Sequence, residues 1–272
     1  MPEKLVIPLG EVQKTLFLPL WGRAVETRKD RPLLSDPTAV RIMESVEFDF
    51  PTLARNMKSI TRHAWIARSI LIDRCVSAFL GVHPDGTVVN IGCGMDTTFD
   101  RVDNGRVRWF DLDLPDVIAL RKEFIAGTSR RTSIASSFLE DGWFPQVEAQ
   151  GKMLFVAAGV FYYYEEKEIR AFMLRLAGRF PGSAIVFDAA SPRGVEASNR
   201  LVLRAGGLGD RSPLKWGLKS GKVLASWDPR IRVIAEHFYF REAGLCLTPG
   251  ERLTGMLSDA LRIQWLVHCG LG

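Results

Sequence analysis

A glycine turn that follows an apolar β-branched run is the first feature with chemical potential. Val88–Ile91 leads into Gly92-Cys93-Gly94, where the missing side chains let the backbone approach a ligand closely. A dinucleotide fingerprint needs a third glycine at position 97, but Thr97 stands there, and the sequence has no Walker lysine motif. The turn therefore either holds a ligand without a pyrophosphate cradle or is a tight structural turn.

Two carboxylates follow this turn by about 20 residues, the distance at which doubly wound folds present an acid to ribose hydroxyls. Asp111 and Asp113 are two positions apart on a predicted strand, so they share one face until Leu114-Pro115 ends the strand. A carboxylate here can accept hydrogen bonds from both the 2′ and 3′ hydroxyls. The alternative is an acidic strand end that faces water.

An arginine lies in the middle of an apolar helical stripe upstream of the turn. At 100° per residue, the apolar residues within about 60° of Arg68 are Ala64, Leu71, Ile72, Cys75 and Phe79. A buried guanidinium is costly without an anionic partner. That partner is either one of the protein's own carboxylates or the carboxylate of a ligand. A ligand with a ribose at one end and a carboxylate at the other fits S-adenosylmethionine better than NAD.

The elements that must position these residues alternate between strands and helices. Residues 165–179 form the clearest helix, with apolar residues at i, i+3, i+4 and i+7, and residues 10–80 also read as helical. The predicted strands are Thr87–Ile91, Val107–Phe110, Met153–Val156 and Ala184–Phe187. This alternation predicts an α/β fold with a doubly wound, mostly parallel sheet, whose ligands lie beyond the carboxyl ends of the strands.

The motifs in this order resemble those of a known family. Asn90–Thr98, then Arg101, then Asp111–Pro115 are similar to the leucine carboxyl methyltransferase family, including its bacterial polyketide O-methyltransferase (tetracenomycin-type) branch, and the match extends over about 15–190. The resemblance implies a Rossmann-like class I S-adenosylmethionine-dependent methyltransferase fold. We expect one domain over 1–272: an N-terminal helical lid (1–85), a cofactor-binding core (86–190), a cap insertion (191–235) and the end of the core sheet (236–272).

The resemblance also implies roles for individual residues around S-adenosylmethionine. The Ala67-Arg68 step matches an arginine that binds the methionine carboxylate, and a further basic residue, counted back from Asp36-Pro37, falls on Arg28. The other cofactor-binding residues that it implies are Gly92 and Gly94 under the methionine and ribose, Asp113 and Asp111 at the ribose, and Ser137-Phe138 beside the adenine.

One position departs from the family pattern. Many relatives have an acidic residue after the fourth strand, whereas this chain has Ala158, which supplies no carboxylate to a cofactor or substrate. Tyr162 and Tyr163 are candidates for the acceptor pocket, or else core aromatics with a polar handle. His63 and His237 are further pocket candidates, although a structural histidine is the alternative for each. No residue is assigned as catalytic.

Composition and charge limit the remaining possibilities. The net charge of +5 comes from 36 basic and 31 acidic residues that are scattered along the chain, which argues against nucleic-acid binding. The four cysteines are far apart and lack zinc-ligand spacing, so we expect no metal. Neither a membrane span nor a signal peptide is evident, which predicts a cytoplasmic protein.

The expected activity is O-methylation of a hydroxyl or carboxylate on a small molecule. Polyketide-like molecules are among the candidate acceptors. Two alternatives stay open: methylation of a protein C-terminal carboxylate, and a noncatalytic S-adenosylmethionine-binding sensor. A carboxylate acceptor is already ionised at neutral pH, whereas a phenol would benefit from a base. Basic residues from Arg193 to Lys222, with Arg200, Arg204, Arg211 and Lys215 among them, lead us to expect a cap over an anionic or polyphenolic acceptor.

Overall fold

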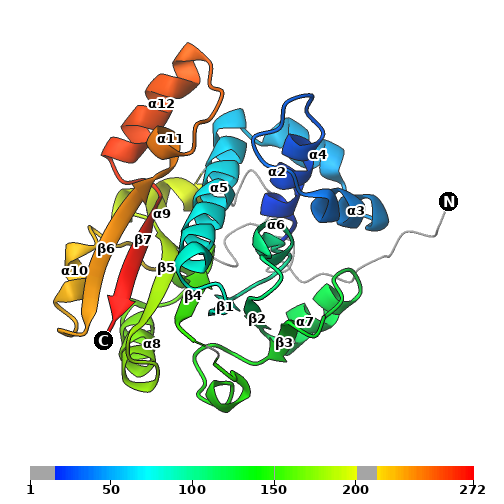
Figure 1. Cartoon of the computed structure of the whole chain (residues 1–272). Helices are drawn as coiled ribbons and strands as arrows, with labels where there is room; N and C mark the ends of the chain where they lie inside the picture. Colours follow the sequence, from blue (N-terminus) through cyan, green and yellow to red (C-terminus); the bar gives the residue numbers. More distant parts are fainter. Residues whose placement is uncertain (1–15, 150, 201–212) are drawn as a thin grey trace.

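A seven-stranded sheet forms the centre of the computed structural model, which describes residues 16–149, 151–200 and 213–272 (Figure 1). The strand order is β3-β2-β1-β4-β5-β7-β6. Strands β1 to β5 are parallel, and β7 runs antiparallel to both β5 and β6. The strands are β1 (Thr87–Ile91), β2 (Arg108–Asp113), β3 (Arg131–Ala135), β4 (Met153–Ala157), β5 (Ser183–Ala189), β6 (Ile231–Phe238) and β7 (Trp265–Leu271). The mostly parallel, doubly wound sheet predicted from the sequence is confirmed.

Helices cover both faces of the sheet, which explains why its central strands β1 and β4 are buried along their whole length. The α-helices are α2 (Phe17–Thr27), α3 (Pro37–Ser45), α4 (Phe50–Asn56), α5 (Ser59–Val82), α6 (Thr98–Val102), α7 (Pro115–Lys122), α8 (Glu166–Arg179), α9 (Pro192–Ser198), α10 (Lys222–Ala225), α11 (Tyr239–Glu242) and α12 (Pro249–Ala260). Val88 of β1 packs into a core with α5, while its neighbour Val89 packs into the core that contains α8. Two short 3-10 helices, η1 (Phe144–Gln146) and η2 (Phe161–Tyr163), belong to the second face.

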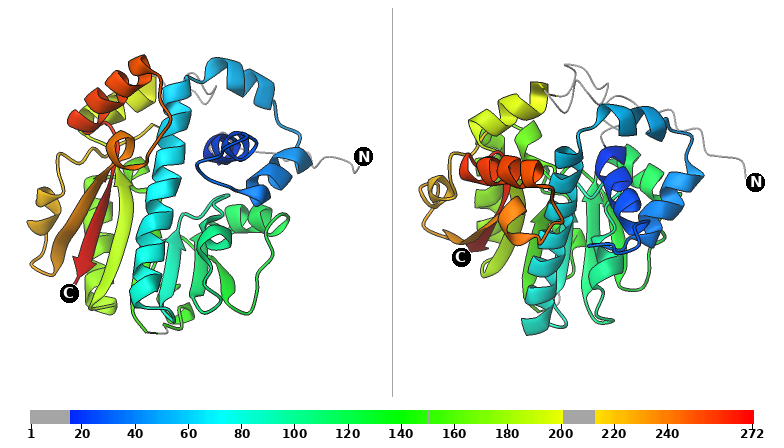
Figure 2. Two further views of the ribbon diagram at one scale, coloured as in Figure 1. Left: turned by 45° about the horizontal axis from the view of Figure 1, so that its top comes forward. Right: turned by 90° about the horizontal axis from the view of Figure 1, so that it is seen from above.

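The N-terminal helices lie over the carboxyl end of β1. Figure 2 shows α2, α3 and α4 grouped beside α5 at this end of the sheet. Phe17 and Leu20 of α2 share a buried cluster with Ile42 of α3 and with Met95, which follows the glycine turn. Pro19 lies in the first turn of α2, where a proline is tolerated because a backbone amide at this position would have no partner within the helix. These helices therefore close the region in which the sequence places its ligand.

The segment expected as a cap insertion, 191–235, differs from that expectation at its end. Strand β6 already begins at Ile231, so the last part of this range belongs to the sheet. The range also contains α9 and α10, while Arg204 and Arg211 lie outside the described residues. No helix of the described part has the length and apolar character needed to cross a bilayer. Cys75, Cys93, Cys246 and Cys269 are all free thiols.

Candidate cofactor and acceptor site

Two adjoining chambers, of about 140 and 160 Å³, open at the carboxyl ends of the parallel strands. We call the first the polar chamber, because Arg23, Arg68 and Asp96 line it. The second is the apolar chamber, and Leu112, Val117, Phe138 and Val160 are among its walls. Both chambers are lined by Leu16, Gly92, Gly159 and Tyr163, so they meet between the turn after β1 and the loop after β4. One elongated ligand can therefore occupy both.

The glycine turn after β1 forms the floor where the chambers meet. Gly92 and Gly94 have φ angles of 59° and 45°, a left-handed conformation that favours glycine. The Gly94 amide donates to Asp113 Oδ2 at 2.7 Å, and its carbonyl accepts from Arg121 Nη1 at 2.6 Å. A Cβ on Gly92 would lie 2.5 Å from Val160 Cγ2, so only a glycine allows the two loops to approach this closely. The turn is thus held from both sides.

Arg68 is buried, as its apolar stripe predicts, and lines the polar chamber. Its Nη1 donates to Asp188 Oδ2 at 2.8 Å and to the Tyr162 hydroxyl at 3.4 Å. The sequence left open whether Arg68 pairs with a carboxylate of the protein or with that of a ligand. The structure shows a pair with the protein's own Asp188. Because the same side chain also faces the chamber, the ion pair does not remove Arg68 from the site.

Arg23, and not Arg28, is the second guanidinium at the polar chamber. Arg28 is exposed and pairs with Glu44 at 2.5 Å, so the expectation that it approaches a ligand carboxylate is corrected. Its position follows the end of α2 at Thr27, which turns it outward to the surface. Arg23 is 3% exposed and lies in the buried face of α2, the same signal that identified Arg68.

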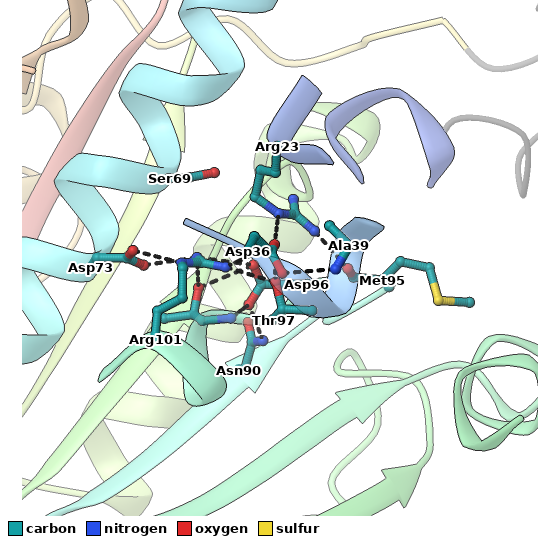
Figure 3. Close-up of polar contacts among 12 residues, drawn as sticks. Arg23, Asp36, Ala39, Ser69, Asp73, Asn90, Met95, Asp96, Thr97 and Arg101 are labelled. Carbon is teal, nitrogen blue, oxygen red and sulfur yellow. Dashed lines mark hydrogen bonds and ion pairs between the residues drawn. The ribbon is translucent and has the colours of Figure 1, made fainter. Parts of the chain in front are cut away.

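An ion network joins the N-terminal helices to the glycine turn (Figure 3). Asp36 caps α3 and accepts from Arg23 Nε at 2.7 Å, while Arg23 Nη2 donates to the Met95 carbonyl, also at 2.7 Å. Arg101 approaches Asp36 at 3.3 Å and forms a two-pronged pair with Asp73 of α5. Burial alone would raise the pKa of Asp36, but the two guanidinium groups hold it below its usual value. The lid helices are therefore attached to the turn by buried charge.

Asp96 is the carboxylate that this network presents to the polar chamber. Its oxygens accept from the Thr98 amide and hydroxyl, each at 3.0 Å, and from the Asn90 side-chain amide at 3.1 Å. Burial opposes ionisation, but Arg101 and Arg23 lower the pKa of Asp96 to about 2. It is therefore charged at neutral pH, although the sequence interpretation did not assign it a role.

The two aspartates of β2 have different surroundings. Asp113 lines the apolar chamber, and burial raises its pKa although the amides of Gly94 and Leu114 donate to it. Asp111 is 1% exposed, lines neither chamber, and accepts from Arg121 Nη2 at 3.0 Å and Arg131 Nε at 2.7 Å. The expected contact of Asp111 with a ribose is therefore corrected. Asp111 instead supports Arg121, which holds the Gly94 carbonyl.

Of the other candidate residues predicted from the sequence, some line the chambers and some lie elsewhere in the molecule. Ser137 and Phe138 line the apolar chamber, and Phe138 packs edge-on against Tyr164. Tyr162 and Tyr163 line the polar chamber, beside Ala158. His63 and His237 line neither chamber: the first lies 3.6 Å from Glu251, and the second pairs with Glu242 at 2.9 Å in a separate groove. The described residues that line the two chambers include no histidine, lysine or glutamate.

Comparison with known proteins agrees with this architecture. The family model for leucine carboxyl methyltransferase matches residues 17–177. The chain is 31% identical over 228 residues to the tetracenomycin polyketide synthesis O-methyltransferase TcmP of Streptomyces glaucescens, covering 83% of this chain and 82% of that protein. It is 25% identical over 200 residues to the S-adenosyl-L-methionine-dependent methyltransferase dpfgK of Gibberella zeae, covering 67% and 66%.

A solved structure shares the fold at low sequence identity. A DUF574 family protein from Streptomyces avermitilis superposes with a TM-score of 0.58 and 10% identity, covering 94% of this chain and 97% of that one. The Rossmann-like fold and the family resemblance predicted from the motifs are confirmed. With the family match spanning the lid, the glycine turn and β2, the chain belongs to the leucine carboxyl methyltransferase family.

Proposed function

We propose that this protein is an S-adenosylmethionine-dependent O-methyltransferase and that its acceptor is the carboxylate of a small molecule. The observation that carries the proposal is the pair of chambers that meet at Gly92 and Gly159. One chamber holds two guanidinium groups and a carboxylate, and the other combines apolar walls with Asp113. This division fits a ligand with a zwitterionic tail at one end and a nucleoside at the other.

The polar chamber matches an amino-acid tail. Arg68 and Arg23 are positioned to bind its carboxylate, and the ionised Asp96 offers a partner to its ammonium group. Charge-assisted hydrogen bonds of this kind are about twice as strong as neutral ones. Ala158 carries no charge, so Asp96 is the carboxylate among the described residues that line this chamber.

The apolar chamber matches a nucleoside. Each oxygen of Asp113 accepts one backbone amide, which leaves lone pairs for the hydroxyls of a ribose. Leu112, Val117 and Phe138 provide apolar walls for an adenine, and Ser137 adds a hydroxyl. The third glycine of a dinucleotide fingerprint is replaced by Thr97, whose hydroxyl donates to Asp36 and not to a pyrophosphate site.

The side chains around the polar chamber position an acceptor and are not arranged to deprotonate it. When bound, S-adenosylmethionine supplies an activated methyl group on its sulfonium. Among the described lining residues, the titratable groups outside the proposed cofactor contacts are Cys93, Tyr162 and Tyr163, and burial raises the pKa of Cys93 and Tyr162 well above their usual values. A carboxylate acceptor needs no base, because its pKa of about 4 leaves it ionised at neutral pH.

Positioning then accounts for the rate. Holding a nucleophilic oxygen in line with a methyl group can supply about 7 to 11 kcal/mol of the barrier. Trp65, Ile72 and Leu214 give the polar chamber apolar walls, and Ser198 and Gln264 add neutral hydrogen-bonding groups. We propose that these residues bind an aromatic carboxylic acid, and the similarity to the polyketide O-methyltransferase TcmP over most of the chain favours a polyketide-like one. We further propose that the enzyme acts in the cytoplasm.

The acceptor group can be identified from the product. Incubation with methyl-labelled S-adenosylmethionine and paired aromatic carboxylic acids and phenols is expected to label the acids, and mild alkali should release the label as methanol. An alkali-stable product would indicate an ether and contradict the carboxylate proposal. Binding of the cofactor without transfer to any small molecule or C-terminal peptide would support the noncatalytic sensor instead.

The cofactor contacts can be tested by calorimetry with S-adenosylhomocysteine. Arg68→Met and Asp113→Asn are each expected to weaken binding tenfold or more, which corresponds to about 1.4 kcal/mol. NAD and ATP serve as controls and are expected to bind neither the native protein nor the variants. Unchanged affinity for S-adenosylhomocysteine in both variants would contradict the proposed site.

A further inference from the structure

Asp188, at the end of β5, connects two walls of the site. Its side chain is 1% exposed and lies behind the lining of the polar chamber. Oδ2 accepts from Arg68 Nη1 at 2.8 Å, and Oδ1 accepts from the Gly159 amide at 2.6 Å. Arg68 belongs to α5 and Gly159 to the loop after β4, so one carboxylate links the guanidinium to the loop shared by both chambers.

The loop and the guanidinium fit together closely at this link. Gly159 has a φ of 80°, and a Cβ at this position would lie 2.9 Å from Arg68 Nη1 and 3.4 Å from the Tyr162 hydroxyl. Within the described residues, the hydrogen bonds of the Arg68 guanidinium all use Nη1. The ion pair with Asp188 therefore uses Nη1 of the guanidinium, and Nε and Nη2 take no part in these hydrogen bonds.

Asp188 also supplies the negative charge that balances Arg68. The phenols of Tyr162 and Tyr239 are close by, but burial raises the pKa of both well above the usual value, so they stay neutral. The Tyr239 hydroxyl has no hydrogen-bond partner within the described part of the chain. Ala158, next to the loop glycine, contributes no charge. An unbalanced buried guanidinium would be strongly unfavourable.

We infer that Asp188 is a positioning residue for the cofactor: it orients Arg68 towards the methionine carboxylate and holds the Gly159 loop against it. This inference rests on the role of Arg68 in the proposed function. A carboxylate is needed because each of its oxygens accepts from a different donor. An amide of the same shape accepts with only one oxygen and would place an N–H against the other donor.

Asp188→Asn is therefore expected to weaken S-adenosylhomocysteine binding about tenfold. Binding of 5′-methylthioadenosine, which lacks the amino-acid tail, should change less than twofold. In kinetics, the KM for S-adenosylmethionine should rise while kcat at saturation stays within about threefold. Thermal unfolding and circular dichroism would show that the variant is folded.

A double-mutant cycle with Arg68→Met separates positioning from a general structural effect. If Asp188 acts through Arg68, Asp188→Asn should cost less than a further twofold in the Arg68→Met background. Independent, multiplicative losses, or an equal loss for 5′-methylthioadenosine, would overturn the inference. Native affinity for S-adenosylhomocysteine in Arg68→Met would instead contradict the role of Arg68 in the proposed function, a result that differs from both.

A second variant covers the case in which Asp188→Asn does not fold. Gly159→Ala would place a Cβ 2.9 Å from Arg68 Nη1 without changing the Asp188 side chain itself. We expect its loss of affinity to be at least fivefold larger for S-adenosylhomocysteine than for 5′-methylthioadenosine. Equal losses for the two ligands would contradict the inferred link between the loop and Arg68.

Discussion

Substitution of Gly92 by alanine is a quantitative test of how the two chambers meet. The residue has a φ of 59°, and an L side chain in this conformation costs about 1–2 kcal/mol. The new Cβ would also lie 2.5 Å from Val160 Cγ2 and 3.1 Å from Cγ1, so the loop after β4 must move. Overpacking of this kind costs about 1–3 kcal/mol. The free energy of unfolding should therefore fall by about 2–5 kcal/mol.

Two further variants separate the conformational cost from the steric cost. Gly105 has a φ of 77°, and a Cβ at this position would meet no atom within 4 Å, so Gly105→Ala should lose only the conformational part, about 1–2 kcal/mol. Val160→Ala removes both Cγ atoms and leaves Val160 Cβ at 3.4 Å, an ordinary contact distance. In the Val160→Ala background, Gly92→Ala should therefore cost about as much as Gly105→Ala.

Urea unfolding at equilibrium measures these differences. The expected coupling between Gly92→Ala and Val160→Ala is about 1–3 kcal/mol, the steric part of the cost. Titration with S-adenosylhomocysteine should also show weaker binding to Gly92→Ala, because the displaced loop lines both chambers. Equal losses of stability in Gly92→Ala and Gly105→Ala, with no relief by Val160→Ala, would refute the close approach of the two loops.

Two other predictions concern the lid network. Arg23→Met should lower the free energy of unfolding by about 3–5 kcal/mol, because it breaks a buried pair with Asp36. Arg28→Ala should change it by less than about 1 kcal/mol, because its pair with Glu44 is exposed. Chemical denaturation of both variants measures the difference, and equal effects would contradict the burial of the Arg23–Asp36 pair. The pKa of Asp96 falls from 3.8 to about 2, because Arg101 and Arg23 outweigh the effect of burial. Its ionised form therefore stabilises the fold above pH 3.8, and this contribution, roughly 2 kcal/mol, is lost as the pH falls towards 2. Asp96→Asn should flatten acid unfolding in this window, and an unchanged pH profile would contradict the shift.

The sheet and the glycine turn could be predicted because their signals are local. Short β-branched runs that alternate with an amphipathic helix at 165–179 indicate parallel strands, and strands β1, β2, β4 and β5 lie within a few residues of the predicted ranges. The burial of Arg68 followed from helical periodicity alone. Asp113, Ser137 and Phe138 line a chamber because all three lie at the carboxyl ends of strands.

Two predictions that rested on spacing along the chain, those for Arg28 and Asp111, are wrong. Arg28 was placed by its distance from Asp36-Pro37, but α2 ends at Thr27 and directs it to the surface. Asp111 shares a strand with Asp113, yet it lies further from the strand end, where Arg121 and Arg131 enclose it. Neither outcome follows from periodicity, because the enclosing side chains come from other elements.

By itself, the sequence determined strands β1, β2, β4 and β5, the helix at 165–179, the position of the glycine turn and the burial of Arg68, because these depend on local periodicity and on residue type. The tertiary structure decided which groups neutralise the buried charges. Arg68 pairs with Asp188, a carboxylate 120 residues away, and Asp36 pairs with Arg101, which is 65 residues away. Such contacts depend on how helices pack over the sheet, and several carboxylates of the chain satisfy the same electrostatic requirement until the fold selects one.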